Sequence, residues 1–383
     1  MSLLFPTAES PAAAGMSAGG LQAVAALFDA HLAAGLHPGA HLLVIRRRQI
    51  VCERYAGLAD PRRRRPVRPD TIWLLFSATK PYTAVAVLKL AVEGRIDLDA
   101  PVARYWPAFA QNGKAEITVR QVLSHRAGLP HGKISRQPWY WPSWRLCTRA
   151  IEQMRPDTPP GQEVAYHALT FGWILGELVR RVDGRSLRRY LTDELFGPAG
   201  WRHTYLGLPA EAGVWERRNS VAAIDPDPDL LQSAFVANHR LFRRAPIPAG
   251  SGHSTLYEHA AFYQMLIDGG VWDGRRLLSP AVVDLLTTPT NPDPGQMDLV
   301  LGKPTRWAHG VSLGGPPRRG FASFMGRSSS PRTFGHGGLR SLAAWADPDR
   351  QLICLYFTNG LLSAQGSDER NIEMSDAVWA SVV

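Results

Sequence analysis

Cysteine is scarce in this chain of 383 residues, which contains three: Cys52, Cys147 and Cys354. They are far apart in the sequence, and none belongs to a Cys-x-x-Cys pair or to a Cys/His pattern with the spacing of zinc ligands. An odd, dispersed set in apolar surroundings predicts buried free thiols rather than disulfides or a metal centre. We therefore expect neither a metal ion nor another cofactor.

Long hydrophobic runs are also absent. No run of about 18 apolar residues occurs, so the sequence predicts no membrane-spanning helix and no membrane partner. Residues 1–20 lack a basic start followed by an apolar core, which predicts no secretion signal and a cytoplasmic location, although a mature form with its leader removed would look the same. At 45% hydrophobic residues, the chain can still bury a large core.

Lysine is rare as well, with five residues among the 43 basic ones, yet the net charge is +10 because arginine supplies the rest. The densest runs are Arg46 to Arg48, at a predicted hairpin turn, and Arg62 to Arg65, in a proline-flanked loop. Neither run is interleaved with aromatic residues or belongs to a nucleic-acid-binding motif. We interpret both as solvated loops and expect no nucleic-acid partner.

Strand patterns gather at the two ends of the chain. Near the N-terminus they predict a β-hairpin from residues 41–46 and 50–55, and near the C-terminus strands at 333–339, 341–346 and 351–358. Amphipathic helices are predicted at 21–36 and 371–383. Strands at both ends with helices between them predict one sheet built from the two termini.

Helical patterns fill the middle of the chain. They predict helices at 83–92, 169–182, 186–195, 254–268 and 279–287, and mostly loop at 206–250, while 288–335 is too rich in glycine and proline to order. The expected fold is α/β (α+β), one catalytic domain spanning residues 1–383. A sheet subdomain of about 20–80 and about 331–383 would carry a mainly helical subdomain of about 81–330, with a cleft where they meet.

The segment Ser77-Ala-Thr-Lys80 lies where a predicted helix begins. Residues three apart share a helix face, so the Ser77 hydroxyl and the Lys80 amine should lie side by side. A buried lysine with a lowered pKa can take the proton of a serine nucleophile. A motif this short also occurs by chance. The alternative interpretation is that Ser77 caps a helix and Lys80 is a solvated lysine.

Two further elements accompany this pair: Tyr166 after a Pro-Gly turn, and His336-Gly337-Gly338 on a predicted strand. In this order they resemble the three motifs of the serine β-lactamase and penicillin-binding-protein superfamily. Connecting segments such as Leu123-Ser-His-Arg-Ala-Gly-Leu-Pro130 and Pro248-Ala-Gly-Ser-Gly252 look like those of its class C branch and the related family VIII carboxylesterases and acyltransferases. The resemblance extends from about residue 21 to the C-terminus, and it implies a β-lactamase-like fold.

The resemblance also implies roles for the matching residues. Ser77 would be acylated by a substrate carbonyl, Lys80 would accept or relay its proton, and Tyr166 would be a second base and a proton shuttle. The backbone N–H groups of Ser77 and Leu339 would form the oxyanion hole, with Gly337 and Gly338 allowing the substrate to approach closely and His336 facing the cleft. Which of Lys80 and Tyr166 is the base in each step stays open.

Two departures from the family pattern bear on the substrate. A lysine of the third motif, able to bind a substrate carboxylate, is replaced by His336, and the asparagine two residues after the tyrosine is replaced by Ala168. We therefore expect a serine hydrolase acting on a small-molecule ester, either a carboxylesterase or a transacylase with an alcohol or amine acceptor. A β-lactamase or D,D-peptidase, and a catalytically silent binding or sensor module, are the alternatives, and the oligomeric state is left open.

Several aromatic, histidine and charged residues outside the three motifs are also candidates for a role in the pocket or in the structure. Within the aromatic segment 139–144, Trp141 and Trp144 either line a pocket for an apolar acyl group or cover the core. His125 and His167 are interpreted as structural, with His167 also a candidate for the pocket wall. Lys89 and Glu93, four residues apart, are expected to form a surface ion pair.

Overall fold

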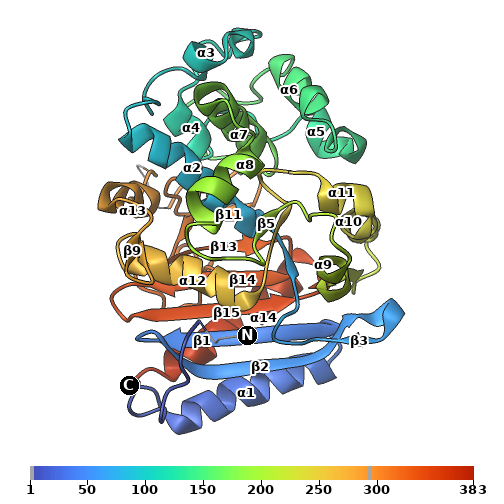
Figure 1. The fold of residues 1–383 in the computed structure, drawn as a ribbon, viewed down its shortest axis with the longest axis vertical. Helices are drawn as coiled ribbons and strands as arrows, with labels where there is room; N and C mark the ends of the chain where they lie inside the picture. The colour runs from blue at the N-terminus through green and yellow to red at the C-terminus, as the bar shows by residue number, and fades with distance from the viewer. Residues whose placement is uncertain (1–3, 292–294) are drawn as a thin grey trace.

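The central feature of the computed structural model, which describes residues 4–291 and 295–383, is a seven-stranded antiparallel sheet (Figure 1). Its strand order is β12-β13-β14-β15-β1-β2-β3, so strands from the two ends of the chain meet where β15 pairs with β1. The strands are β1 (Gly39–Arg46), β2 (Gln49–Asp60), β3 (Arg65–Pro66), β12 (Ser312–Leu313), β13 (Phe334–Gly338), β14 (Leu342–Asp347) and β15 (Leu352–Thr358). The sheet built from both chain ends is confirmed.

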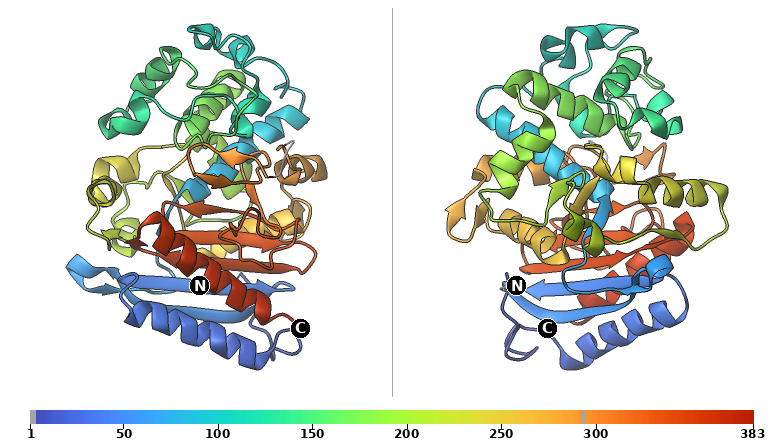
Figure 2. Two further views of the ribbon diagram at one scale, coloured as in Figure 1. Left: turned by 180° about the vertical axis from the view of Figure 1, so that it is seen from behind. Right: turned by 45° about the vertical axis from the view of Figure 1, so that its right-hand side comes forward.

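Helices cover both faces of this sheet (Figures 1 and 2). Helices α1 (Ala18–Ala33) and α14 (Ala364–Ala380) pack on one face, where Leu42 and Val44 of β1 point. Helix α12 (Leu256–Ile267) packs on the other, where Leu43 and Ile45 point. All eight residues of β1 are buried because alternate side chains enter two different cores.

A helical region lies above the sheet in the view of Figure 1. At its centre is α2, which begins just after Ser77 and packs against α7, α8 and α13. Its helices are α2 (Lys80–Val92), α3 (Val102–Tyr105), α4 (Val119–Leu123), α5 (Lys133–Arg136), α6 (Trp144–Glu152), α7 (Thr170–Asp183), α8 (Leu187–Leu191), α9 (Ala212–Arg217), α10 (Pro228–Asn238), α11 (Arg240–Arg244) and α13 (Pro280–Thr287).

Short strands complete the structure. A second sheet, of order β4-β7-β5, leads into the segment that carries Ser77. The strands outside the main sheet are β4 (Trp73–Phe76), β5 (Tyr205–Leu206), β6 (Ala222–Ala223), β7 (Gly252–Ser254), β8 (Val271–Trp272), β9 (Arg275–Arg276), β10 (Met297–Asp298), β11 (Lys303–Pro304) and β16 (Gly360–Leu361).

The expectation that residues 206–250 are mostly loop is wrong, because this segment contains α9, α10 and α11. Its prolines and aspartates include a helix start: the Asp227 side chain accepts hydrogen bonds from the N–H groups of Asp229 and Leu230, and Pro228 occupies the first turn. The closing helix likewise begins earlier than expected, at Ala364, with Ser363 as its N-cap.

The expected Lys89–Glu93 pair is also wrong. Lys89 forms an ion pair with Glu194, which the turn after α8 brings across α2, while Glu93 lies 3.7 Å from Arg95. The three cysteines are free as expected, although Cys52 is only half-buried.

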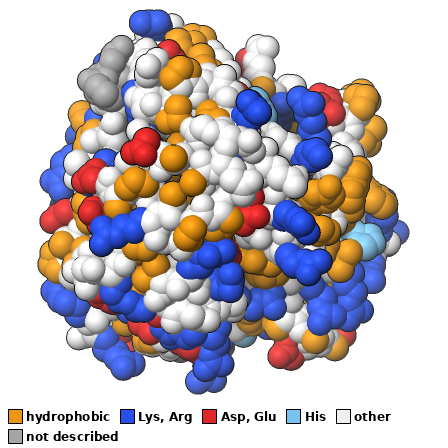
Figure 3. Space-filling model, turned by 90° about the horizontal axis from the view of Figure 1, so that it is seen from above, with side chains coloured by type: hydrophobic (Ala, Val, Ile, Leu, Met, Phe, Trp, Pro, Cys, Tyr) orange, Lys and Arg blue, Asp and Glu red, His pale blue; other side chains and the backbone are white. Residues whose placement is uncertain are grey.

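The arginine runs are largely exposed, as expected for solvated loops, except for Arg46 and for the half-buried Arg65, which pairs with Asp60. Arg46 is buried at the end of β1 and donates to the Gly15 carbonyl (3.0 Å). On the face seen in Figure 3, Lys and Arg side chains are spread between apolar and uncharged surface rather than joined in one stripe. No helix in the described part of the chain is long and apolar enough to cross a membrane.

Candidate active site

Ser77 lies in a tight turn between β4 and α2. The residue before it, Phe76, has φ 46° and ψ −131°, a conformation that costs a non-glycine residue about 1–3 kcal/mol. The Thr79 hydroxyl supports the turn by donating to the Phe76 carbonyl (2.6 Å) and accepting from the Gly252 N–H (2.8 Å). A single 3₁₀ turn over Ser77–Thr79 then runs into α2, which brings Ser77 and Lys80 to the same side.

Lys80 is fully buried and contacts only uncharged groups. Its Nζ lies 3.0 Å from the Ser77 Oγ and 2.7 Å from the Tyr166 hydroxyl, and it donates to the carbonyls of Ala168 (2.8 Å) and Ala249 (3.5 Å). Within the described residues, no carboxylate forms an ion pair with it. Burial therefore holds the pKa of Lys80 well below its ordinary value of 10.5.

The partners of Lys80 can be satisfied by the neutral amine that its lowered pKa favours. Such an amine has two N–H donors and one lone pair. Since carbonyl oxygens only accept, the two N–H groups satisfy Ala168 and Ala249. The lone pair then faces the hydroxyls of Ser77 and Tyr166, either of which can donate to it.

Tyr166 is held by an aromatic and hydrogen-bonded frame. Its ring stacks on Trp307, with centroids 5.5 Å apart and an interplanar angle of 10°, and its backbone N–H donates to the Asp298 carboxylate (3.0 Å). The ring also contacts His125, at 4.8 Å between centroids, and His125 in turn lies 4.5 Å from Trp307. Burial raises the pKa of the Tyr166 hydroxyl, which favours the protonated phenol over the phenolate.

Asp298 and Trp307 were not found by sequence reasoning. The buried Asp298 carboxylate accepts from the N–H groups of Tyr166, Val300 and Leu301 and from the Trp307 indole (3.3 Å). It thereby ties both aromatic rings to one anchor. These residues lie in the glycine- and proline-rich segment that the sequence could not order, and Asp298 is 132 residues from Tyr166, so no local pattern marks them.

His336 lies on β13, facing the Tyr166 ring at 6.1 Å between centroids. Its Nδ1–H donates to the Gly337 carbonyl (2.7 Å), and its buried Nε2 has no partner among the described residues. Burial lowers its pKa to about 3. His336 is therefore a neutral group that offers a hydrogen-bond acceptor at Nε2.

The end of β13 lies against the chain that leads to Ser77. A Cβ atom on Gly338 would lie 2.5 Å from the Leu75 carbonyl oxygen, so only glycine fits there without a shift. This close approach brings the next residue, Leu339, to the rim of the site, where it lines the same two cavities as Ser77.

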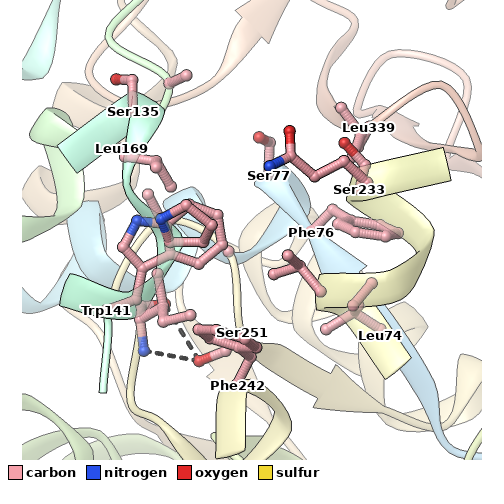
Figure 4. Close-up of a pocket in the computed structure, with 18 of the residues that line it drawn as sticks. Leu74, Phe76, Ser77, Ser135, Trp141, Leu169, Ser233, Phe242, Ser251 and Leu339 are labelled. Atoms are coloured by element: carbon pink, nitrogen blue, oxygen red, sulfur yellow. Dashed lines mark hydrogen bonds between the residues drawn. The ribbon is translucent and has the colours of Figure 1, made fainter. Parts of the chain in front are cut away.

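Two cavities meet at Ser77. The first, of about 540 Å³, has mainly apolar walls from α5, α10, α11 and the segments around them; Figure 4 shows Trp141 and Phe242 across it from Ser77. The second, of about 490 Å³, is lined by Tyr166, His336, Gly337 and Gly338 and by the segment 300–324. Ser77, Ala168 and Leu339 line both.

The three candidate pocket residues, Trp141, Trp144 and His167, lie in different parts of the structure. Trp141 lines the apolar cavity, with its ring 5.8 Å from Phe242 between centroids. Trp144 and His167 line neither of these two cavities, and of the alternatives weighed for them the core and structural positions fit. Trp144 packs on Trp173 and donates to Glu177 (2.7 Å), and the buried His167 accepts from the Leu129 N–H (2.9 Å) in the core behind Tyr166.

Comparison with known proteins bears directly on this arrangement. The family model described as Beta-lactamase matches residues 24–378. Over 351 residues, covering 82% of this chain and 75% of the relative, the chain is 32% identical to "Esterase/beta-lactamase LipL" of Mycobacterium tuberculosis.

Solved structures agree with the sequence matches. A penicillin-binding protein homologue from Caulobacter crescentus superimposes with a TM-score of 0.81 at 31% identity, covering 96% of this chain and 99% of that one. A family VIII carboxylesterase superimposes with a TM-score of 0.76 at 30% identity, covering 94% and 98%. The chain thus has the β-lactamase-like fold that its motifs predicted, and it belongs to the beta-lactamase family of serine hydrolases.

Proposed function

We propose that this protein is a small-molecule carboxylesterase or transacylase that acts through an acyl-Ser77 intermediate. The observation that carries the proposal is the buried Lys80 amine, 3.0 Å from the Ser77 Oγ and without a carboxylate partner in the described part of the chain. A neutral amine in that position is a base for the serine hydroxyl.

The site residues divide the chemistry between them. Lys80 accepts the Ser77 proton as the Oγ attacks the ester carbonyl, and the N–H groups of Ser77 and Leu339 stabilise the oxyanion. Lys80 passes that proton through Tyr166 to the oxygen of the departing alcohol, and the C–O bond breaks. Water or a second alcohol then attacks the acyl-serine by the reverse proton path. Because burial raises the pKa of Tyr166, we assign the base to Lys80 and the proton shuttle to Tyr166.

An ester is favoured over a β-lactam or a peptide because the third motif carries no cation. His336 is neutral, and at the position of the family asparagine Ala168 offers only its carbonyl, which binds Lys80. The family VIII carboxylesterase supports the same choice, whereas the relative from Mycobacterium tuberculosis is named for both activities.

The test is the time course of p-nitrophenyl butyrate cleavage together with the intact mass of the protein. We expect turnover and a transient butyryl adduct in the wild type, and neither in Ser77→Ala. Equal turnover in Ser77→Ala would contradict the proposal. Rapid hydrolysis of a chromogenic cephalosporin without ester turnover would favour a β-lactamase, and no labelling of Ser77 by a fluorophosphonate would favour a silent module.

A further inference from the structure

The cavity that contains Tyr166 is rich in positive charge. Four basic side chains line it, and the one acidic side chain among its lining residues, Asp368, already forms an ion pair with Lys303 (2.5 Å). The remaining three, Arg306, Arg318 and Arg340, form no ion pair with a carboxylate of the described residues. Guanidinium groups bind carboxylates and phosphates through strong, often bidentate hydrogen bonds, so these three half-exposed arginines offer the cavity unused anion-binding groups.

Arg306 and Arg318 are the pair of interest. The Arg306 Nη1 donates to the carbonyls of Gly314 and Pro331, both neutral groups, while the buried Nε of Arg318 has no partner among the described residues. Burial, and then the charge of Arg318, lower the pKa of Arg306. Two guanidinium groups thus line one cavity without a carboxylate partner among the described residues, an arrangement that an anionic ligand would stabilise.

The position of Tyr166 shows which part of a substrate would enter this cavity. A group that protonates the departing oxygen must lie on the same side of the reacting carbonyl as the departing alcohol. Tyr166 lines this cavity and does not line the apolar one. The alcohol portion of the ester therefore belongs here, and the acyl portion belongs in the apolar cavity beside Trp141.

We propose that this cavity binds an alcohol carrying an anionic oxygen group, a carboxylate or a phosphate, through Arg306 and Arg318. The inference rests on the proposed esterase or transacylase function and specifies its alcohol. The alcohol is either the one released when Ser77 is acylated or the one that later accepts the acyl group, because both pass through the same space. His336 supplies no cation, so the positive charge comes instead from the segment between β11 and β13.

The kinetic test compares 4-carboxyphenyl butyrate with its neutral methyl ester in the wild type and in Arg306→Gln/Arg318→Gln. The ratio of the two kcat/KM values is compared between proteins, so the intrinsic reactivities of the esters cancel. Loss of charge-assisted contacts should lower the anionic-to-neutral ratio about tenfold or more in the double variant. Arg319→Gln, an exposed neighbour that does not line the cavity, should leave the ratio unchanged.

A second arm separates the two sources of the alcohol. Butyryl transfer from vinyl butyrate to 4-(hydroxymethyl)benzoate is compared with transfer to its methyl ester. If the double variant lowers the anionic-to-neutral ratio only for acyl transfer, the anionic alcohol is the acceptor. If it lowers that ratio only for hydrolysis, the anionic alcohol is the leaving group. 2-Phosphoglycolate as an inhibitor of both reactions, with glycolate alongside, distinguishes phosphate from carboxylate.

A binding measurement keeps this inference separate from the proposed function. Calorimetry with Ser77→Ala should show 4-hydroxybenzoate binding at least tenfold more tightly than methyl 4-hydroxybenzoate, with the difference lost when Arg306 and Arg318 are also replaced by glutamine. Such binding without ester turnover in the wild type would contradict the esterase and leave the anion site standing. Equal binding of the two phenols, or equal kinetic ratios in the wild type and a folded double variant, would overturn the inference.

Discussion

The chemistry of this site depends on one buried amine. In the unfolded chain Lys80 would hold its proton up to about pH 10.5, whereas burial lowers its pKa in the folded protein. At pH values between the lowered pKa and 10.5, Lys80 is protonated in the unfolded chain but not in the folded protein. The contribution of Lys80 to the free energy of unfolding therefore rises with pH in this range. Acidification through the lowered pKa protonates the amine, removing the base and leaving a buried charge without a carboxylate.

We therefore predict that kcat/KM for p-nitrophenyl butyrate falls on the acid side as Lys80 becomes protonated, with a midpoint well below 10.5. His336, whose pKa is about 3, is neutral throughout pH 5–8 and should add no inflection near 6.5. The measurement is a pH–rate profile of the wild type and His336→Gln. An acid limb that disappears in His336→Gln would instead assign it to the histidine.

Two tryptophans predicted together from the sequence should behave differently. Trp141→Ala removes a wall of the apolar cavity, so kcat/KM for a hexanoyl ester should fall roughly tenfold and the preference for acyl chain length should change. Trp144→Ala should leave that preference unchanged and lower stability by about 3 kcal/mol, because its ring packs on Trp173. Chain-length profiles and thermal unfolding of both variants check this pair, and a shifted profile in Trp144→Ala would contradict it.

Among the individual site residues, the sequence predicted those contacts that depend on local spacing along the chain. The three-residue interval placed Ser77 beside Lys80, and the family resemblance added Tyr166 and His336, which the structure brings to the same site. Asp298 could not be predicted, because an aspartate that binds backbone N–H groups from a distant segment leaves no pattern in the sequence.

Among the elements, the contact between β13 and the chain before Ser77 determines the shape of the site. Gly338→Ala would place a methyl group 2.5 Å from the Leu75 carbonyl, so β13 and β4 would have to separate. Shifts approaching 1 Å in a reacting geometry cost up to about a hundredfold in rate. We expect kcat/KM to fall at least tenfold.

The neighbouring glycine provides the matched control. A Cβ on Gly337 would come no closer than 3.4 Å, to the Leu342 carbonyl, which is ordinary contact. Gly337→Ala should therefore lose much less activity than Gly338→Ala, as measured by ester kinetics and by the rate of fluorophosphonate labelling of Ser77. Equal losses in the two variants would show that the contact with Leu75 does not matter.

The elements were predicted unevenly, for physical reasons. The strands at the chain ends were found because their apolar runs enter two cores, as in β1. Helix α10 was missed because its start, Asp227-Pro228, has the same composition as a loop, and only the capping geometry reveals its role. The Lys89–Glu93 pair was wrongly predicted because helix spacing cannot anticipate a partner such as Glu194, brought in by tertiary packing.

For the whole molecule, the sheet order joins residues that are distant in the sequence. Strand β1 has β2 on one side and β15 on the other, and α14 packs against α1. A chain ending at residue 330 would contain Ser77, Lys80 and Tyr166 but lack β13, β14 and β15. We predict that such a truncation is not labelled by a fluorophosphonate and aggregates, whereas labelling equal to that of the full chain would contradict this view.

The position of β15 also has a consequence during protein synthesis. After a ribosome completes the β1–β2 hairpin at residue 60, β1 waits for a partner that begins at residue 352. At about 5–20 residues per second, that delay is roughly 15–60 s. Until β15 is synthesised, the strand β1 has one unpaired edge, which can pair with a strand of a neighbouring nascent chain. The hairpin that will form the middle of the sheet is thus a segment of the newborn protein that a chaperone would protect.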